Sequence, residues 1–85
     1  MLLIKLVSTA YCGPCKAYKP ILQQFCNENN LSLQEIDVDT NPEFVHTYGI
    51  SSVPTTMIFK DGQLVQKMTG AVPKSQLQAL VQAYK

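Results

Sequence analysis

The stretch LVSTAYCGPCK, residues 6–16, carries the decisive features of this 85-residue chain. It begins inside an almost continuous apolar run, residues 2–7, which is typical of a strand covered on both faces. Pro14 favours the first turn of a helix, where its missing N–H leaves no hydrogen bond unmade. Cys12 and Cys15 therefore lie where a buried strand ends and a helix begins.

This position makes the two cysteines chemically unequal. A spacing of three residues places both sulfur atoms on one face of the first helical turn, close enough to bridge. Unpaired N–H groups at a helix start favour thiolate over thiol, and they can lower a cysteine pKa from about 8.5 to about 7 or below. We expect Cys12 to be the exposed, attacking thiolate and Cys15 to be the shielded, resolving thiol. Gly13 and Pro14 form the turn between them, which Pro14 stiffens.

Other interpretations of this cysteine pair stay open. C-x-x-C is half of a zinc site, but the remaining candidate ligands are Cys26 and His46. Cys26 lies roughly 16 Å beyond Cys15 along a helix that rises 1.5 Å per residue, too far to share a metal. An inert structural disulfide would close almost no loop. We expect no bound metal or cofactor, a buried and inert Cys26, and an exposed His46.

The rest of the chain predicts one α/β domain, residues 1–85. We expect strands at about 2–7, 31–39, 55–59 and 64–69, and helices at about 12–29, 40–48 and from residue 73 onwards. Pro20 should kink the first helix without breaking it. The order βαβ(α)ββα predicts a parallel first pair of strands and an antiparallel last pair, joined at an Asp61-Gly62 turn. The result is a four-stranded mixed sheet with helices on both faces.

Charge and hydropathy argue against several classes of protein. Seven basic residues, all lysine, oppose six acidic residues, for a net charge of +1. Without arginine, no guanidinium group is present to make paired hydrogen bonds to phosphate or guanine, which argues against nucleic-acid binding. No apolar run approaches the roughly 20 residues that span a bilayer. Residues 1–7 are interpreted as a strand and not as a signal peptide, so we expect a cytoplasmic protein without membrane partners.

The motifs resemble those of the thioredoxin family over nearly the whole chain. Residues 12–16, Cys-Gly-Pro-Cys-Lys, match the family's active-site motif, and Val53-Pro54-Thr55 matches its cis-proline loop. The other matching segments are Pro20, Asp37-Val38-Asp39, Asn41-Pro42, Tyr48-Gly49-Ile50, Phe59-Lys60-Asp61-Gly62, Gly70-Ala71 and Gln76-Leu77. Full-length thioredoxins are longer than this chain, because they carry an extra N-terminal strand and helix. The length is instead similar to that of compact thioredoxin/glutaredoxin-like proteins.

The resemblance implies a thioredoxin-like fold and an enzyme that reduces protein disulfides through a redox-active Cys12–Cys15 disulfide. Pro54 would be cis beside the two sulfur atoms, and the backbone of Val53 would pair with an extended target peptide. Targets would cover a shallow apolar surface formed by Tyr11, Gly13, Pro14, Val53, Gly70 and Ala71. An NADPH-dependent flavoprotein thioredoxin reductase would regenerate the dithiol, and the protein would act as a monomer.

One departure from the family pattern concerns the proton on Cys15. The family buries an aspartate six residues before the first cysteine, where this chain has Leu6. The lysine that usually pairs with that aspartate aligns with Glu35. We hypothesise that Glu35 faces the underside of Cys15 and serves as its proton acceptor. The alternative is that Glu35 is a solvated residue at a strand end. A second departure is Tyr11, which replaces the usual tryptophan.

Two other functions stay open. A glutaredoxin regenerated by glutathione would suit the short length. However, glutaredoxins usually carry Cys-Pro-Tyr-Cys and a Gly-Gly pair after the last strand, where this chain has Gly70-Ala71, and no arginine is present for the carboxylates of glutathione. The third function is a non-catalytic, thioredoxin-fold subunit that binds a partner such as a polymerase through the active-site surface.

Overall fold

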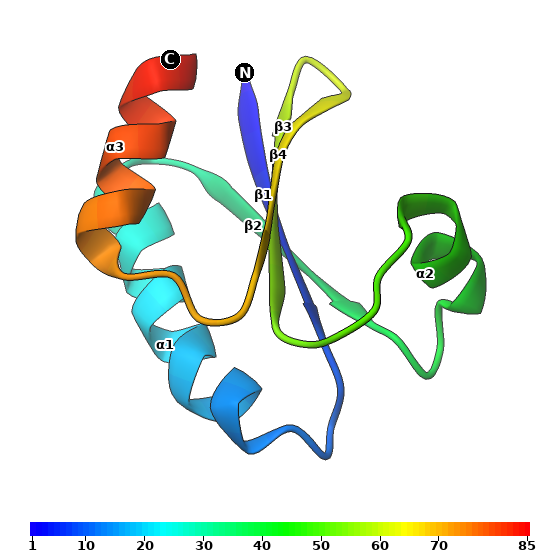
Figure 1. The fold of residues 1–85 in the computed structure, drawn as a ribbon. Coiled ribbons are helices and arrows are strands. Elements are labelled where there is room, and N and C mark those ends of the chain that lie inside the picture. The colour runs from blue at the N-terminus through cyan, green and yellow to red at the C-terminus, as the bar shows by residue number, and fades with distance from the viewer.

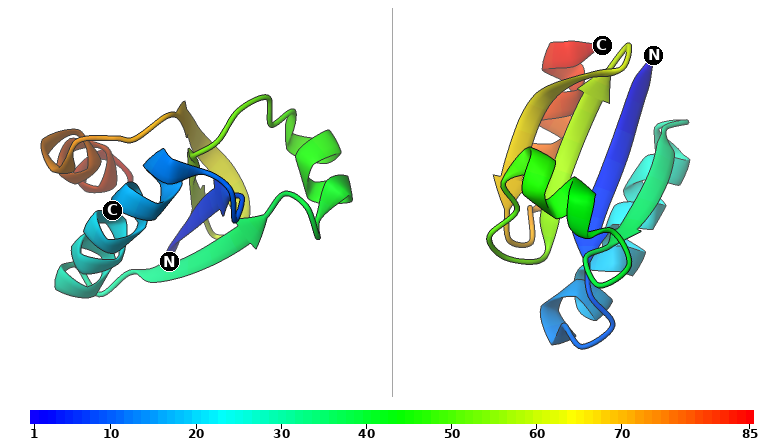
Figure 2. Two further views of the ribbon diagram at one scale, coloured as in Figure 1. Left: turned by 90° about the horizontal axis from the view of Figure 1, so that it is seen from below. Right: turned by 90° about the vertical axis from the view of Figure 1, so that its right-hand side faces the viewer.

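The computed structural model describes all residues from Met1 to Lys85. Its elements are β1 (Leu2–Ser8), α1 (Gly13–Glu28), β2 (Ser32–Asp37), α2 (Pro42–Tyr48), β3 (Thr55–Lys60), β4 (Gln63–Thr69) and α3 (Lys74–Tyr84). The strands form one sheet in the order β2-β1-β3-β4 (Figure 1 and Figure 2). β1 pairs parallel with β2 and antiparallel with β3, and β3 pairs antiparallel with β4. Helices α1 and α3 cover one face, and α2 lies on the other (Figure 2). The predicted four-stranded mixed sheet flanked by three helices is confirmed.

Strand β1 lies inside the sheet and supplies side chains to two hydrophobic cores. Leu2, Ile4 and Leu6 pack in the larger core with α1 and α3. Val7 points the other way and packs with Met57 in the smaller core beneath α2. Because successive side chains of a strand face opposite sides, burial on both sides requires a nearly continuous apolar run, which only Lys5 interrupts here. This requirement explains the sequence at residues 2–7.

Helix α1 presents one stripe of side chains to the core and runs through Pro20 without a break. The buried residues of this stripe are Cys15, Tyr18, Leu22, Phe25 and Cys26. At the end of the helix, the side chain of Asn29 donates a hydrogen bond to the carbonyl of Phe25 at 2.8 Å. No helix in the structure combines the length and the apolar character needed to cross a bilayer.

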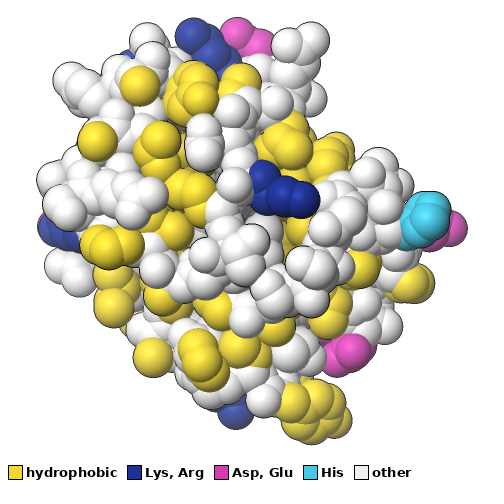
Figure 3. Space-filling view, viewed as in Figure 1, with side chains coloured by type: hydrophobic (Ala, Val, Ile, Leu, Met, Phe, Trp, Pro, Cys, Tyr) yellow, Lys and Arg dark blue, Asp and Glu magenta, His cyan; other side chains and the backbone are white.

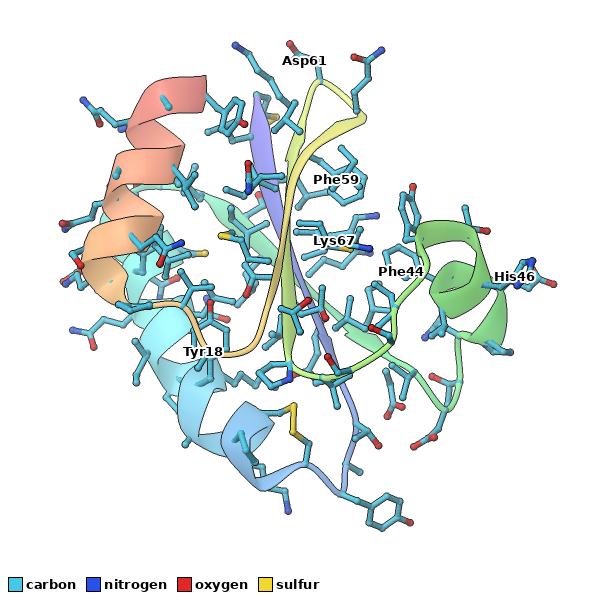
Figure 4. All side chains as sticks on the ribbon, viewed as in Figure 1. Tyr18, Phe44, His46, Phe59, Asp61 and Lys67 are labelled. Atoms are coloured by element: carbon cyan, nitrogen blue, oxygen red, sulfur yellow. A yellow bond between two sulfur atoms is a disulfide. The ribbon has the colours of Figure 1, made fainter.

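The turn between β3 and β4 has the predicted Asp-Gly chemistry. Asp61 and Gly62 have φ angles of 52° and 86°, in the left-handed region that this turn requires. The pairing of the two strands shifts between Ile58 and Phe59, an irregularity that was not predicted. The amino group of Met1 lies 2.7 Å from the carboxylate of Asp61 (Figure 4), and this hydrogen bond lowers the pKa of Asp61.

A buried hydrogen bond joins α1 to β3. The hydroxyl groups of Tyr18, labelled in Figure 4, and Thr56 lie 2.8 Å apart, and both residues are almost completely buried. Burial raises the pKa of Tyr18, although the hydrogen bond with Thr56 opposes this effect. The pair connects the helix that begins at the cysteines to the strand that follows Pro54.

We expect Tyr18→Phe to lower the free energy of unfolding by about 1–3 kcal/mol, because it leaves the Thr56 hydroxyl buried without its partner. Adding Thr56→Val removes the second polar group and should restore most of the loss. Urea unfolding of the wild type, both single variants and the double variant measures these differences. A double variant no more stable than Tyr18→Phe would contradict the assignment.

Candidate active site

Cys12 is the N-cap residue of α1. Its backbone is extended, with φ −97° and ψ 110°, which is ordinary for an N-cap. The backbone N–H of Cys15 donates a hydrogen bond to Cys12 Sγ at 3.1 Å. A donor at the positive end of a helix stabilises negative charge on this sulfur. The local structure therefore provides the environment that favours a thiolate at Cys12.

The two cysteines are joined by a disulfide, visible as the yellow bond in Figure 4. Their Cα atoms are 5.2 Å apart, within the range that a disulfide spans. Cys12 is partly exposed, whereas only 3% of Cys15 is accessible. The predicted order, accessible first and shielded second, is confirmed. A molecule that approaches from solvent therefore meets the sulfur of Cys12 first.

Contacts between neighbouring loops fix the place where α1 begins. The hydroxyl of Thr9 donates a hydrogen bond to Asp39 Oδ2 at 2.9 Å. The backbone N–H of Val38 donates to the carbonyl of Ser8, also at 2.9 Å. These bonds connect the segment after β1 to the segment after β2. The start of α1 is therefore held against the carboxyl ends of the parallel strands.

The cis-proline loop lies at the same end of the molecule as the start of α1 (Figure 1). The Val53–Pro54 peptide bond is cis, as the resemblance implies. The carbonyl of Pro54 accepts a hydrogen bond from the N–H of Gly70 at 2.7 Å. Gly70 has φ 88°, a conformation that favours glycine. Val53 is partly exposed, and its backbone makes no hydrogen bond within the chain.

The other residues predicted for the target surface are open to solvent. Tyr11 is 91% exposed, and Gly13, Pro14 and Ala71 are also exposed. A Cβ atom added at Gly13 would meet no atom within 4 Å, so nothing covers this turn. Pro14 and Ala71 line one common hollow, which joins the cysteine turn to the connection between β4 and α3.

Glu35 shares a polar hollow of about 230 Å³ with Cys15. The hollow is lined by Ser8, Thr9, Ala10, Cys15, Lys16, Lys19, Glu35 and Asp37. Glu35 is the β2 neighbour of Leu6, and its carboxylate reaches across to α1, where it lies 3.0 Å from Lys19 Nζ. The Glu35 side chain is 40% exposed. Glu35 therefore lines the same hollow as Cys15, as the proton-acceptor hypothesis requires, and it is also solvated, as the alternative requires.

Lys19 was not identified from the sequence. Its position four residues after Cys15 places it one helical turn further along α1, on a similar face. That spacing is a weak signal, because an ion pair to Glu35 depends on how β2 packs beside the helix. Ile21 follows the apolar spacing of the helix in the sequence, but its side chain is 51% exposed.

Cys26 and His46 do not belong to the site around Cys12 and Cys15. Cys26 is fully buried in the core, and desolvation raises its pKa to about 11. His46 is exposed on α2 (Figure 4). No group of three or more His, Cys, Asp or Glu side chains is arranged to hold a metal ion. Cys26 therefore has the buried, protonated character expected of an inert thiol.

In the reduced, folded protein, we expect iodoacetamide at about pH 8 to label Cys12 and to leave Cys26 unlabelled. With a pKa of about 11, roughly one Cys26 thiol in a thousand is ionised at that pH, and burial shields it further. Peptide mass spectrometry before and after unfolding in guanidinium measures the difference. Native labelling of Cys26 at the rate of Cys12 would show that this thiol is accessible.

Comparison with known proteins agrees with this geometry. The family model described as Thioredoxin matches residues 1–83. The chain is 42% identical to the thioredoxin of Bacillus subtilis over 73 residues, which cover 84% of this chain and 70% of that protein. It is 42% identical to the thioredoxin of Mycobacterium bovis over 69 residues, 79% of this chain and 60% of that one.

A solved structure of a mutant thioredoxin from Halobacterium salinarum has the same fold. It matches with a TM-score of 0.90 and 28% identity, covering 98% of this chain and 74% of that one. The match of the family model to nearly all residues, together with the paired cysteines at the start of α1, decides the assignment. The chain belongs to the thioredoxin family of thiol–disulfide oxidoreductases.

Proposed function

We propose that the protein reduces disulfide bonds in other proteins, with Cys12 as the nucleophile and Cys15 as the resolving thiol. The observation that carries this proposal is the difference between the two sulfur atoms. Cys12 Sγ accepts a hydrogen bond from the N–H of Cys15 and is accessible, whereas Cys15 is 3% exposed. An exchange reaction requires one ionised, accessible thiol and a second thiol within reach.

The reaction begins with attack by the thiolate of Cys12 on one sulfur of a target disulfide. A bond forms between Cys12 Sγ and that sulfur, and the other target sulfur leaves as a thiolate with the electron pair. Cys15 then loses its proton and attacks Cys12 Sγ. The Cys12–Cys15 disulfide forms, and the second target sulfur leaves as a thiolate. Two electrons pass from the protein to the target, and two protons convert the target thiolates into thiols.

An extended segment of the target would dock beside the cis-proline loop. The backbone of Val53 is without an intramolecular hydrogen bond and is partly exposed. An unpaired backbone segment of this kind can receive an added strand. Tyr11, Gly13, Pro14, Gly70 and Ala71 would form the rest of the target surface. Pro54 would shape this surface, because it contributes no N–H that a target must satisfy.

The proposal needs no bound cofactor or metal, because the two sulfur atoms carry both electrons. The partners would be proteins that contain disulfides and an NADPH-dependent flavoprotein thioredoxin reductase as the reductant. The protein would act as a monomer, as one thioredoxin-like domain over residues 1–85, in the cytoplasm. Nucleic acids and membranes are not among the proposed partners.

Insulin reduction tests the function and the source of electrons together. We expect precipitation of the insulin B chain when the protein is supplied with NADPH and thioredoxin reductase, and little when it is supplied with glutathione, NADPH and glutathione reductase. Efficient insulin reduction in the glutathione mixture, and not in the thioredoxin reductase mixture, would instead identify a glutaredoxin. If neither mixture reduces insulin, while the protein still binds a partner after both cysteines are replaced by serine, the non-catalytic subunit is the correct function.

Glu35 is proposed to accept the proton of Cys15, directly or through a water molecule. The proposal is supported by the hollow that both residues line and by the exposure that lets the carboxylate exchange protons with solvent. General-base assistance would accelerate the resolving step at pH values where the Cys15 thiol remains protonated. The Lys19 ammonium, at 3.0 Å, would keep the carboxylate near the hollow.

We therefore expect Glu35→Gln to slow insulin reduction at and below neutral pH and to shift the pH–rate profile towards alkaline values. Stopped-flow measurement of the resolving step across this range tests the shift. Glu28→Gln is the matched control, because Glu28 forms a similar exposed ion pair, with Lys74 at 2.8 Å, away from the cysteines. If Glu35→Gln and Glu28→Gln give the same profile as the wild type, Glu35 is a solvated strand residue.

A further inference from the structure

Helix α1 carries a second apolar stripe beside the cysteines, which shares Tyr18 with the core and otherwise lies outside it. The stripe consists of residues 14, 17, 18 and 21, which share one helical face because they recur at spacings of three and four. Tyr18 is buried at its base, whereas Pro14, Ala17 and Ile21 are exposed. Half of the Ile21 side chain is accessible to solvent, at 51%. An apolar side chain exposed on this face adds nothing to the core of the free protein.

The connection between β4 and α3 forms the opposite wall of a groove. Ala71, Val72, Pro73 and Lys74 face the stripe across an open volume of about 460 Å³. Figure 3 shows hydrophobic side chains gathered on this part of the surface, over α1 and the start of α3. Lys74 is the one charged residue in the lining, and its Nζ lies 2.8 Å from the Glu28 carboxylate. We call this feature the α1 groove. Its lining suits an uncharged, apolar side chain.

The exchange reaction itself brings a polypeptide to the α1 groove. The mixed disulfide attaches the target cysteine to Cys12 Sγ, and the groove begins two residues further on, at Pro14. Ile21 lies nine positions after Cys12, or roughly 13 Å along the helix at 1.5 Å per residue, which an extended target chain covers with about four residues. The covalent bond also raises the effective concentration of the neighbouring target segment at the groove.

We propose that the α1 groove is a specificity subsite that binds an apolar side chain of the target about four residues from the attacked cysteine. This inference rests on the proposed function, because it requires a target polypeptide joined to Cys12. Ile21 is then a specificity-determining residue, which the target covers during the exchange. The remaining target contacts, at Tyr11 and Val53, lie on other segments and are independent of this groove.

Two sets of short peptides test the proposal. Every peptide contains a single cysteine, which forms a disulfide with mercaptoethanol. One set carries leucine about four residues before or after the cysteine, and the other carries serine at the same place. We expect the wild type to reduce one of the leucine peptides with a kcat/KM about tenfold higher than its serine counterpart, as burial of most of a leucine side chain allows. Ile21→Ser should remove this preference.

Leu64→Ser is the matched control, because Leu64 is also an exposed apolar residue, at 37%, but lies on β4 near the hairpin turn. It should keep the full leucine preference. Hydroxyethyl disulfide, which has no peptide segment, reports the exchange chemistry alone. If the wild type fails to reduce it, the proposed function fails. If the wild type reduces it and the leucine preference is absent, or survives Ile21→Ser, the subsite is wrong.

Discussion

Replacing Cys12 with serine should reduce insulin reduction to the background rate of the external reductant. A serine hydroxyl remains protonated near neutral pH and cannot form the sulfur–sulfur bond on which the exchange depends. A serine hydroxyl can accept the hydrogen bond that the N–H of Cys15 donates to Cys12 Sγ, so the helix start stays intact while the nucleophile is lost. The measurement is the rate of insulin precipitation with NADPH and thioredoxin reductase.

Cys26→Ala is the control for this result, because Cys26 is a buried thiol outside the active site. It should retain activity once its stability has been confirmed by thermal unfolding. Activity of Cys12→Ser close to that of the wild type would remove Cys12 from the mechanism. Loss of activity in a folded Cys26→Ala variant would instead show that Cys26 takes part in the reaction.

Replacing Cys15 with serine should trap the protein on its target. Cys12 can still attack, but no second thiol is present to displace the target, so the mixed disulfide persists. We expect a covalent adduct of one protein and one target chain on a non-reducing gel, which dithiothreitol releases. Cys12→Ser should form no such adduct. Adducts of equal amount with both variants would show that the two sulfur atoms have no distinct roles.

The succession of strands and helices along the chain could be predicted because each relevant signal is local. The apolar run at residues 2–7, the Asp61-Gly62 turn and the helical spacing after Pro14 each report the structure of neighbouring residues. The unequal exposure of Cys12 and Cys15 also follows from local structure, since one residue caps the helix and the other lies in its first turn. The structure confirms these expectations.

Features that depend on distant segments could not be predicted in the same way. The irregularity between Ile58 and Phe59 arises from the pairing of β3 with β4, and no residue type marks it. The Lys19–Glu35 ion pair depends on the distance between α1 and β2. Similarly, Ile21 follows the same apolar spacing as the core residues of α1. Only the position of the β4–α3 connection leaves this side chain on an open groove.

The proposed exchange reaction depends on the ionisation of Cys12 at the start of α1. Its most direct test is the rate of iodoacetamide alkylation of the reduced protein as a function of pH, with each cysteine followed by mass spectrometry. We predict that Cys12 reacts fastest and reaches half its maximal rate well below the pH of about 8.5 that is ordinary for a cysteine. Alkylation of Cys12 that rises only at or above that pH, or that is no faster than alkylation of Cys15, would contradict the account.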